Sequence, residues 1–328
     1  RNDTLLYPCI RGISRSSIWS HVGRRAAYGE SGEIGLIDPA LVRDREISVV
    51  LTQTWPAFFA RFGRLTPVQR EAIPPILSGT DVLISSATAS GKTEAACAPL
   101  VERNLDRREP WTILYISPTR ALVNDLYERL QRPINMISLS VRRRTGEHHS
   151  TSERMPHVLL TTPESLDSML CRLHLPEGHQ LAQVVAVVLD EVHLLYGTSR
   201  GEQTRWLLER LRRLRSEAKA KGWTSDDSLQ VVALSATVSR PEEVAATYLR
   251  NGTLVHVPGG RTIEVVTPCG GMSSVEQSLP DYIANLQQPE KILVFANSRR
   301  RVDELTVAMR PVLKDLGYMA LAHHGSLD

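Results

Sequence analysis

The chain has 328 residues, of which 42% are apolar and 23% are charged, and its formal net charge is +3. These proportions are ordinary for a globular protein with a sizeable core, and the length leaves room for two domains. The sequence has no apolar stretch long enough to cross a bilayer, and its four separated cysteines suggest neither a zinc site nor a disulfide framework. We therefore expect a cytoplasmic protein with no membrane partner, and the small positive charge is only weak evidence for a polyanionic partner.

The first 50 residues carry little local signal. They mix Arg, Ser and Gly with short apolar pieces, and they could form an accessory layer or an edge strand. We treat residues 1–50 as an N-terminal extension without an assigned function. Because the chain starts at Arg1 without a methionine and stops at Asp328 soon after a helical pattern, we expect it to be a segment of a longer protein.

Patterns of helix and strand sharpen after this extension. Residues 56–62 predict a short aromatic helix. Thr66-Pro67 then supplies a plausible N-cap and a first helical position for a second helix. Pro74-Pro75 is expected to interrupt that helix before a strand over residues 81–86.

Apolar runs then alternate with helical patterns. The expected strands cover residues 112–117, 158–161, 184–190 and 230–235, and the expected helices cover residues 92–105, 120–131, 164–171, 203–219 and 241–249. Runs that are apolar on both faces suit parallel strands with helices on each side. The series predicts an α/β fold with a doubly wound parallel sheet, whose ligand binds at the carboxyl ends of the strands.

A glycine-rich shift in composition at residues 258–272 predicts a linker between two domains. We place the first domain at residues 51–262, the linker at 263–273 and the start of a second α/β domain at 274–328. Expected in this second part are helices over 275–287 and 299–316, the latter kinked or split by Pro311, and strands over 292–297 and 318–322.

The turn between residues 81–86 and 92–105 has the pattern of a phosphate-binding loop. It consists of Ser86, Ala87, Thr88, Ala89, Ser90, Gly91, Lys92 and Thr93. Backbone N–H groups and the positive end of the following helix would surround a β-phosphate. Lys92 would add charge toward the β- and γ-phosphates, and the Thr93 hydroxyl would bind Mg²⁺. Since Ser86 and Ala89 stand where such loops carry glycine, these residues alone leave an ordinary turn as an equal alternative.

Two adjacent acids, Asp190 and Glu191, end a later apolar run. The four apolar residues before them place the pair at the tip of a buried strand. Downstream of a phosphate loop, Asp190 can hold Mg²⁺ directly or through water, and Glu191 can orient and deprotonate the attacking water. Ser235-Ala236-Thr237 ends the next strand, and taken alone it is as consistent with a helix N-cap as with a functional motif.

These segments, in this order, resemble the motifs of superfamily 2 helicases, whose motor is a pair of RecA-like domains. The resemblance covers the chain from about residue 55 to its last residue. It lies in Thr66, Pro67 and Gln69 (Q motif), residues 86–93 (motif I), 117–122 (motif Ia), 161–166 (motif Ib), 190–193 (motif II, a DEVH box), 235–237 (motif III), 293–299 (motif IV) and 323–327, just after it. The phrases Leu-Ser-Ala-Thr-Val, Asn-Ser-Arg-Arg-Arg, His-His-Gly-Ser-Leu and Gly-Thr-Ser-Arg-Gly look most like Lhr-type (large helicase-related) proteins.

The resemblance implies roles for individual residues. Gln69 would read the adenine edge, because an amide can pair with N6 and N7. His193, Ser235 and Thr237 would couple the nucleotide state to domain closure. The residues implied to contact the phosphates of a single strand are Thr119, Arg120, Thr161 and Thr162, with Asn297, Ser298 and Arg299 from the second domain.

The implied function is that of an ATP- and Mg²⁺-dependent helicase or translocase in DNA repair, which moves 3′→5′ on single-stranded or partially duplex nucleic acid, with DNA favoured over RNA. An RNA helicase of the same superfamily is one alternative. A non-hydrolysing nucleic-acid-binding module with protein partners in a repair or defence complex is another. The family's motifs V and VI lie beyond Asp328, and motif VI supplies an arginine finger worth roughly 10³–10⁵ in rate. This segment alone is therefore expected to hydrolyse ATP very slowly and not to unwind a duplex.

Other charged stretches have plainer explanations. The run at residues 142–144, three arginines, could contact nucleic acid or form a solvated loop end. The arginine-rich helix at 203–219 also carries Trp206 and leucines at helical spacing, which predicts a packed helix with a basic outer face. His148-His149 and His323-His324 have no accompanying cysteines or acids, so we expect loop residues rather than metal ligands.

Overall fold

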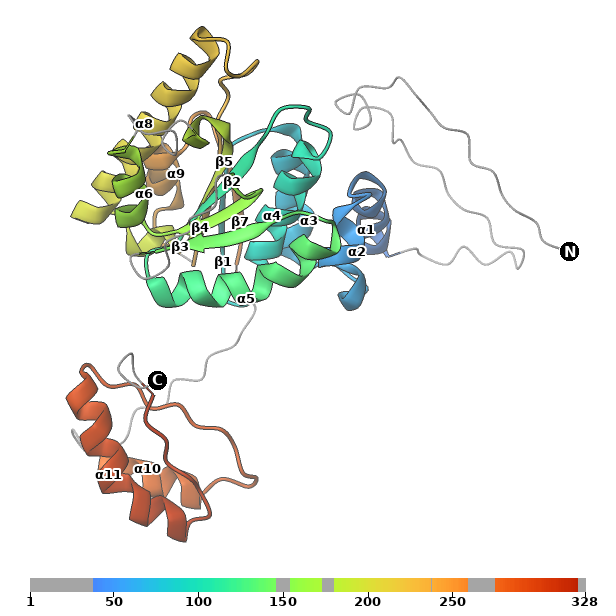
Figure 1. The fold of residues 1–328 in the computed structure, drawn as a ribbon. Helices are drawn as coiled ribbons and strands as arrows, with labels where there is room; N and C mark the ends of the chain where they lie inside the picture. Colours follow the sequence, from blue (N-terminus) through green and yellow to red (C-terminus); the bar gives the residue numbers. More distant parts are fainter. Residues whose placement is uncertain (1–37, 146–153, 173–179, 237, 259–274, 324–328) are drawn as a thin grey trace, which may run out of the picture. The chain divides into compact units, whose positions relative to one another are not determined.

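The structure is a computed structural model that describes residues 38–145, 154–172, 180–236, 238–258 and 275–323. The chain divides into two compact units, Arg1–Gly260 and Arg261–Asp328 (Figure 1). The predicted linker at residues 263–273 lies outside the described residues, so the exact domain limits stay a prediction.

The first unit is built on a seven-stranded sheet. Its strands are β1 (Val82–Ser86), β2 (Thr112–Ile116), β3 (Val141–Arg144), β4 (Val158–Thr161), β5 (Val184–Leu189), β6 (Gln230–Ser235) and β7 (Thr253–Val257). They lie in the order β3-β4-β2-β5-β6-β1-β7, and each neighbouring pair is parallel. The predicted doubly wound parallel sheet is confirmed.

Helices cover both faces of this sheet (Figure 1). One side holds α1 (Pro39–Val50), α2 (Thr54–Phe58), α3 (Pro67–Ser78), α4 (Lys92–Asn104) and α5 (Arg120–Met136), and the other holds α6 (Pro163–Leu170), α8 (Ser199–Ala220) and α9 (Pro241–Tyr248). Short 3₁₀ turns are η2 (Ala60–Phe62), η3 (Gln180–Gln183) and η4 (Val192–Leu194). Of the helices in the described ranges, none is long and apolar enough to span a membrane.

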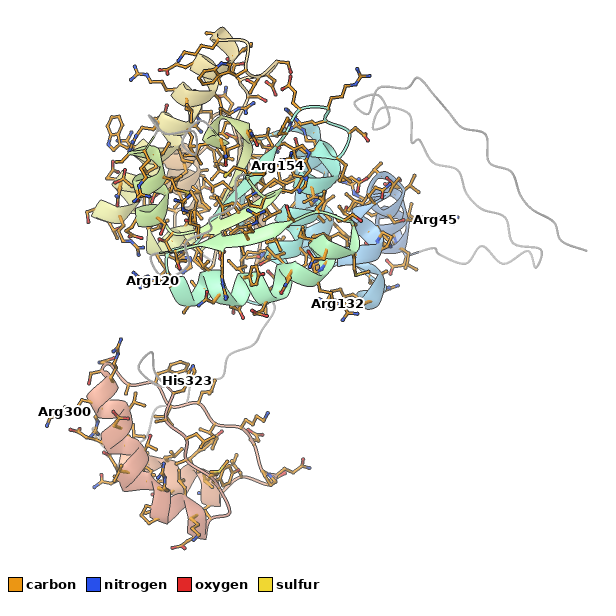
Figure 2. All side chains as sticks on the ribbon, in the orientation of Figure 1. Arg45, Arg120, Arg132, Arg154, Arg300 and His323 are labelled. Atoms are coloured by element: carbon orange, nitrogen blue, oxygen red, sulfur yellow. The ribbon has the colours of Figure 1, made fainter. Side chains whose placement is uncertain are left out.

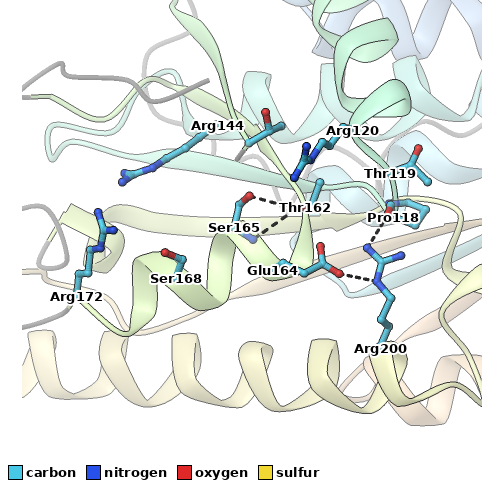
Figure 3. Close-up of a pocket in the computed structure, with 11 residues that line it drawn as sticks. Pro118, Thr119, Arg120, Arg144, Thr162, Glu164, Ser165, Ser168, Arg172 and Arg200 are labelled. Atoms are coloured by element: carbon cyan, nitrogen blue, oxygen red, sulfur yellow. Dashed lines mark hydrogen bonds and ion pairs between the residues drawn. The ribbon is translucent and has the colours of Figure 1, made fainter. Parts of the chain in front are cut away.

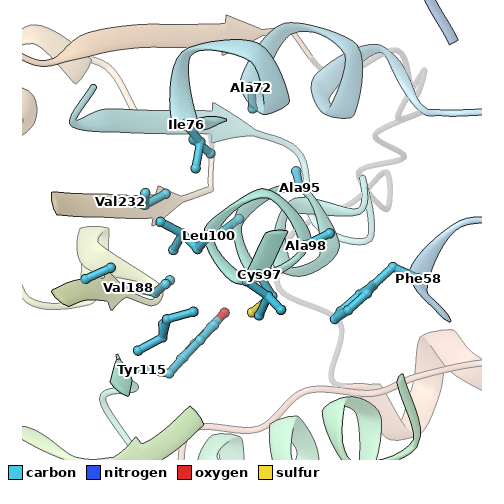
Figure 4. Packing of buried hydrophobic residues seen from close by; sticks show 14 of the residues in the cluster. Phe58, Ala72, Ile76, Ala95, Cys97, Ala98, Leu100, Tyr115, Val188 and Val232 are labelled. Carbon is cyan, nitrogen blue, oxygen red and sulfur yellow. The ribbon is translucent and has the colours of Figure 1, made fainter. Parts of the chain in front are cut away.

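Alternate side chains of each strand enter separate cores, one on each face. In β1, Val82 and Ile84 belong to the core beside α3, α4 and α5, whereas Leu83 belongs to the core beside α6, α8 and α9. Side chains fill the space between the sheet and its helices (Figure 2). In Figure 4, α4 lies between the strand residue Val232 and Phe58 of α2. Burial on both faces is what parallel strands require, and it leaves the strand ends as the polar part of the sheet.

Helix α3 continues through Pro74-Pro75, so the predicted interruption is wrong. A proline inside a helix costs about 3 kcal/mol or more because it removes a hydrogen bond and crowds the preceding turn. Two effects oppose this cost. Ile73 and Ile76 are fully buried, each worth about 1.5–3 kcal/mol, and Thr66 and Gln69 form a capping box at the start of the helix. Tertiary burial therefore outweighs the local preference.

One helix and two strands of the first unit are not among the predicted helices and strands. Residues 39–50 form helix α1, an accessory layer rather than an edge strand, and Asp44 of α1 bonds Arg70 of α3 at 2.6 Å. The arginines at 142–144 form edge strand β3 rather than a loop end, because its backbone pairs with β4. Strand β7 pairs with β1 and forms the edge of the sheet opposite β3.

The second unit contains α10 (Val275–Ala284) and α11 (Arg299–Asp315). Helix α11 is continuous, so Pro311 does not split it. The strands predicted at 292–297 and 318–322 are wrong, since both segments are irregular, and Leu293 and Phe295 are 81% and 90% exposed. A strand needs the hydrogen bonds of a neighbour, and the described residues of this unit provide none.

Candidate nucleotide site and nucleic-acid groove

The loops after β1 and β5 leave the sheet at one edge, because parallel strands share their carboxyl ends. Together with α5 they line a cavity of about 110 Å³. Its lining residues are Thr88, Ala89, Ser90, Gly91, Lys92, Thr93, Leu122, Asp125, Leu126, Arg129, Asp190 and Glu191. Sites for drug-sized ligands measure roughly 300–1,000 Å³, so this cavity suits a phosphate chain with its metal ion rather than a whole nucleotide.

The turn between β1 and α4 keeps a phosphate-loop backbone without the usual glycines. Gly91 is the N-cap of α4 with φ 87°, and a Cβ there would collide with the Gln69 amide. Ala89 also has a positive φ of 59°, which is strained for a residue with a Cβ. Ser86 Oγ lies 2.7 Å from Ser90 Oγ, so its hydroxyl adds a hydrogen bond inside the loop.

Lys92 lines the cavity, and its ammonium group donates hydrogen bonds to the phosphate loop itself. Its Nζ donates to Ser86 O at 2.9 Å and to Ala87 O at 2.8 Å. Burial lowers the pKa of Lys92, while the charges of Glu191 and Asp190 oppose that shift. A phosphate oxygen would be a stronger acceptor for this ammonium than the two neutral carbonyls are.

Asp190 and Glu191 directly follow β5, as predicted from the apolar run before them. Asp190 is 7% exposed, and Ser117 Oγ donates to its Oδ2 at 3.4 Å. Burial, together with the charge of Glu191, raises the pKa of Asp190 to about 6, against the opposing effects of Ser117 and Lys92. At neutral pH the site therefore holds a carboxylate that is ionised at an energetic cost.

His193 connects this loop to the end of β6. The backbone N–H of Ala236 donates to His193 Nδ1 at 3.3 Å, so that nitrogen acts as an acceptor. Glu191 Oε2 lies 3.3 Å from the same nitrogen, but with no proton on Nδ1 the two atoms form no hydrogen bond. Among the described residues, Glu191 Oε2 and Ser235 Oγ are buried polar atoms without a hydrogen-bond partner. Such atoms are costly, and a bound water or ligand can satisfy them.

The donor and acceptor set fits a magnesium-bound nucleotide. Thr93 and Asp190 offer the hydroxyl and carboxylate oxygens that Mg²⁺ prefers. Lys92 and the start of α4 offer cationic and N–H donors for phosphate. The unpartnered oxygen of Glu191 can accept a hydrogen bond from an attacking water.

Gln69 ties helix α3 to the phosphate loop. Its Oε1 accepts from the backbone N–H of Thr66 at 2.9 Å, and its Nε2 donates to Gly91 O at 3.2 Å. Thr66 Oγ1 also donates to Ser90 O at 2.8 Å. The predicted contact of Gln69 with adenine stays a prediction.

A second cavity, of about 480 Å³, opens at the carboxyl ends of β2, β3 and β4 (Figure 3). We call it the basic groove, and its lining residues are Pro118, Thr119, Arg120, Arg144, Thr145, Thr162, Glu164, Ser165, Ser168, Arg172 and Arg200. Four of these are arginines and one is an acid. Arg120, at the start of α5, lies on the outer surface of the unit (Figure 2). The structure thus brings together Thr119, Arg120 and Thr162, three of the residues predicted to contact nucleic acid.

The threonines of the groove also cap helices. Thr119 Oγ1 accepts from Leu122 N at 3.2 Å, and Thr162 Oγ1 accepts from Ser165 N at 3.4 Å. Thr161 does not line the groove, because it is fully buried and its hydroxyl donates to Arg144 O at 2.7 Å. It supports the end of β3, and its predicted contact with phosphate stays untested.

The remaining predicted residues lie elsewhere. Thr237 lies outside the described residues. Asn297 and Ser298 line a cavity of about 560 Å³ within the second unit. Ser298 is the N-cap of α11, which begins at Arg299. Their predicted contacts with nucleic acid stay predictions.

Sequence reasoning missed the residues that α5 contributes to the phosphate cavity. Leu122, Asp125, Leu126 and Arg129 recur at helical spacing, which is the signal that could have placed them on one face. Arg129 reaches Glu94 of α4 at 3.3 Å. The groove arginines Arg144, Arg172 and Arg200 were also missed as members of one site, because they come from three different elements.

A seven-stranded parallel sheet with a phosphate loop after one strand and paired acids after another defines a RecA-like nucleoside-triphosphate-binding domain. The DEAD/DEAH box helicase family matches residues 66–244. The chain belongs to this family, which confirms the predicted superfamily of helicases.

Similarity to Lhr helicases is also confirmed. The "Lhr helicase/ probable uracil glycosylase" of Mycolicibacterium smegmatis is 32% identical over 293 residues, which are 80% of this chain and 18% of that protein. The "ATP-dependent helicase Lhr-Core" of Sulfolobus acidocaldarius is 28% identical over 317 residues, 86% of this chain and 35% of that protein. A solved structure of the Mycobacterium smegmatis helicase Lhr bound to ssDNA and AMP-PNP matches with 30% identity and a TM-score of 0.64, over 84% of this chain and 38% of that one. The chain therefore spans between 18% and 38% of the length of these relatives.

Asp190→Asn is expected to stabilise the unliganded protein above pH 6. The folded pKa of about 6 exceeds the ordinary value of 3.8, so folding favours the protonated acid and stability is lost as pH rises through this window. Removing the charge removes that loss. We expect the free energy of unfolding to exceed the wild-type value by about 1–3 kcal/mol at pH 8, and by less at pH 5. Urea unfolding at both pH values, without nucleotide, measures this.

Asp226→Asn is the control of opposite sign. Burial acts to raise the pKa of Asp226, but hydrogen bonds from Ser228 and Arg107 hold this pKa well below its usual range. Its loss should therefore lower stability at pH 8. Equal stability of wild type and Asp190→Asn at pH 8 would show that the carboxylate carries no such cost.

Proposed function

We propose that the protein is an ATP-dependent motor that moves along a single strand of nucleic acid held in the basic groove. One observation carries this proposal. Ser117 contacts Asp190 at the phosphate cavity, and the next two residues, Pro118 and Thr119, line the groove. A movement of Asp190 could therefore pass through Ser117 to Pro118 and Thr119, which line the groove that would hold the strand.

The geometry of the nucleotide site supports a proposed role for each of its residues. Lys92 and the N–H groups at the start of α4 hold the phosphates, and Thr93 with Asp190 holds Mg²⁺. Glu191 orients the attacking water and accepts its proton. His193 and Ser235 report the state of this site to the loop after β6, because His193 already bonds Ala236.

The proposed substrate is single-stranded or partially duplex DNA. Hydroxyl and guanidinium groups at the ends of strands suit contacts with phosphate that do not depend on sequence. DNA is favoured because the Lhr structure at 30% identity contains ssDNA, and the resemblance to Lhr-type proteins implies 3′→5′ movement and a part in repair. An RNA substrate is the second candidate, since an "ATP-dependent rRNA helicase RRP3" of Candida glabrata is 24% identical over 286 residues.

ATP hydrolysis by the full-length protein tests this function. We expect single-stranded DNA to stimulate the rate more than RNA of the same length does. Glu191→Gln should lower the stimulated rate by roughly 10²–10⁴, the usual contribution of a general base. If only RNA stimulated hydrolysis, RNA rather than DNA would be the substrate. No hydrolysis under any condition would favour a non-hydrolysing binding module, which the strained Ala89 and the self-bonded Lys92 would then explain.

We further propose that residues 1–328 alone hydrolyse ATP slowly. The resemblance implies an arginine finger from motif VI, which was not found within residues 1–328, and such a finger is worth roughly 10³–10⁵ in rate. Side-by-side assays of residues 1–328 and the full-length protein measure the difference. Equal rates would contradict the proposal.

Arg144 and Arg172 should extend the phosphate track of the groove. For single strands, the slope of log K against log salt concentration changes by about 0.7 for each phosphate that the protein no longer neutralises. Arg144→Gln and Arg172→Gln should each weaken binding of a labelled oligonucleotide and reduce the slope by this amount. Arg213→Gln, an exposed arginine of α8 outside the groove, is the matched control and should leave the slope unchanged. A wild-type slope in both groove variants would exclude direct phosphate contact.

A further inference from the structure

The segment from Gly197 to Gly201 joins the loop that carries Asp190 and Glu191 to helix α8. Its turn is held tightly. Thr198 Oγ1 donates to Leu195 O at 2.6 Å and accepts from the backbone N–H of Gly201 at 3.1 Å. Gly197 has φ 73°, a conformation that favours glycine. The start of α8 is therefore fixed to the loop by its own residues.

Gly201 brings the first turn of α8 into direct contact with that loop. A Cβ at this position would collide with the backbone carbonyl of Leu195 and with the hydroxyl of Tyr248. No side chain larger than hydrogen fits without a shift in the backbone. The first turn of α8 therefore packs directly against the backbone of this loop.

Arg200 extends from this first turn to two elements of the basic groove (Figure 3). Its Nε donates to Glu164 Oε1 at 2.6 Å, and its Nη2 donates to Pro118 O at 2.6 Å. Glu164 lies in the first turn of α6, two residues after Thr162, and Pro118 precedes Thr119. One guanidinium thus joins the two loops that carry the predicted strand-contacting threonines.

We propose that Arg200 is a positioning residue that locks the loop after β2 and the start of α6 to the loop that carries Asp190 and Glu191, which we call the catalytic loop. The groove and the nucleotide site then change shape as one body. This inference rests on the proposed function, because it concerns how that groove holds a strand. The rival role is a direct contact between Arg200 and phosphate, in which its charge alone matters.

Two substitutions separate these roles. Arg200→Lys keeps the charge, but an ammonium cannot donate to two acceptors in the directions that a planar guanidinium reaches. The positioning role predicts that Arg200→Lys binds a labelled single-stranded oligonucleotide about tenfold more weakly than the wild type, although it keeps the charge. Glu164→Ala removes one acceptor of Arg200 and also removes the negative charge of the groove. Positioning predicts weaker binding, by about threefold to tenfold, whereas a charge-only role predicts equal or tighter binding.

The measurements use fluorescence anisotropy and strand-stimulated ATP hydrolysis in the full-length protein. The strand concentration for half-maximal stimulation should rise by the same factor as the dissociation constant. Arg213→Lys and Glu217→Ala, on the exposed side of α8, are the matched controls and should bind as the wild type does. Thermal unfolding checks that each variant folds. If Arg200→Lys does not fold, Glu164→Ala still tests the inference.

The outcomes distinguish this inference from the proposed function. Wild-type affinity in Arg200→Lys, or equal or tighter binding in Glu164→Ala, would overturn the positioning role while the motor function stands. If the wild-type protein neither binds a strand nor shows stimulated hydrolysis, the proposed function fails and this inference fails with it.

Discussion

Every paired strand in the described part of the first unit is parallel, and the five inner strands β4, β2, β5, β6 and β1 are buried along their whole length. The central side chains of these strands are apolar, so the chemistry of the unit gathers where the strands end. Ser117, Asp190 and Ser235 stand at the ends of β2, β5 and β6, and all are nearly inaccessible to solvent. The phosphate cavity and the basic groove share one edge of the sheet because the sheet offers only one carboxyl edge.

The polar groups at this edge are held in a state that costs stability. Asp190 is ionised beside Glu191, a buried oxygen of Glu191 and the hydroxyl of Ser235 lack partners among the described residues, and Ala89 is strained. Costs of this kind persist when the surrounding core determines the fold independently, and they concentrate at functional sites. A divalent cation would offset the repulsion between the two acids, and a water would satisfy the free oxygen of Glu191. These costs would fall on binding of a cation and an ordered water at this edge.

The parts of the site that the sequence predicted are those encoded by local pattern. An apolar strand followed at once by Asp190 and Glu191 is visible without any knowledge of packing. Arg129 and Arg200 reach the two cavities from helices distant in sequence, so only the tertiary structure brings them there. Edge strand β3 has one apolar residue followed by three arginines, and two of the five residues of edge strand β7 are exposed, so neither shows the buried apolar run on which the prediction relied. Pro74-Pro75 misled the prediction because burial, which local rules do not include, holds α3 together.

The loop at residues 117–119 is held from two sides with unequal strength. The distance from Ser117 Oγ to Asp190 Oδ2 is 3.4 Å, near the limit of a hydrogen bond, whereas both bonds from Arg200 measure 2.6 Å and have an ionised donor. Ser117 gives the direct link from this loop to Asp190, and Arg200 gives a second link through α8, whose first turn packs closely against the carbonyl of Leu195 at Gly201. A change at the nucleotide site would reach the groove by both links.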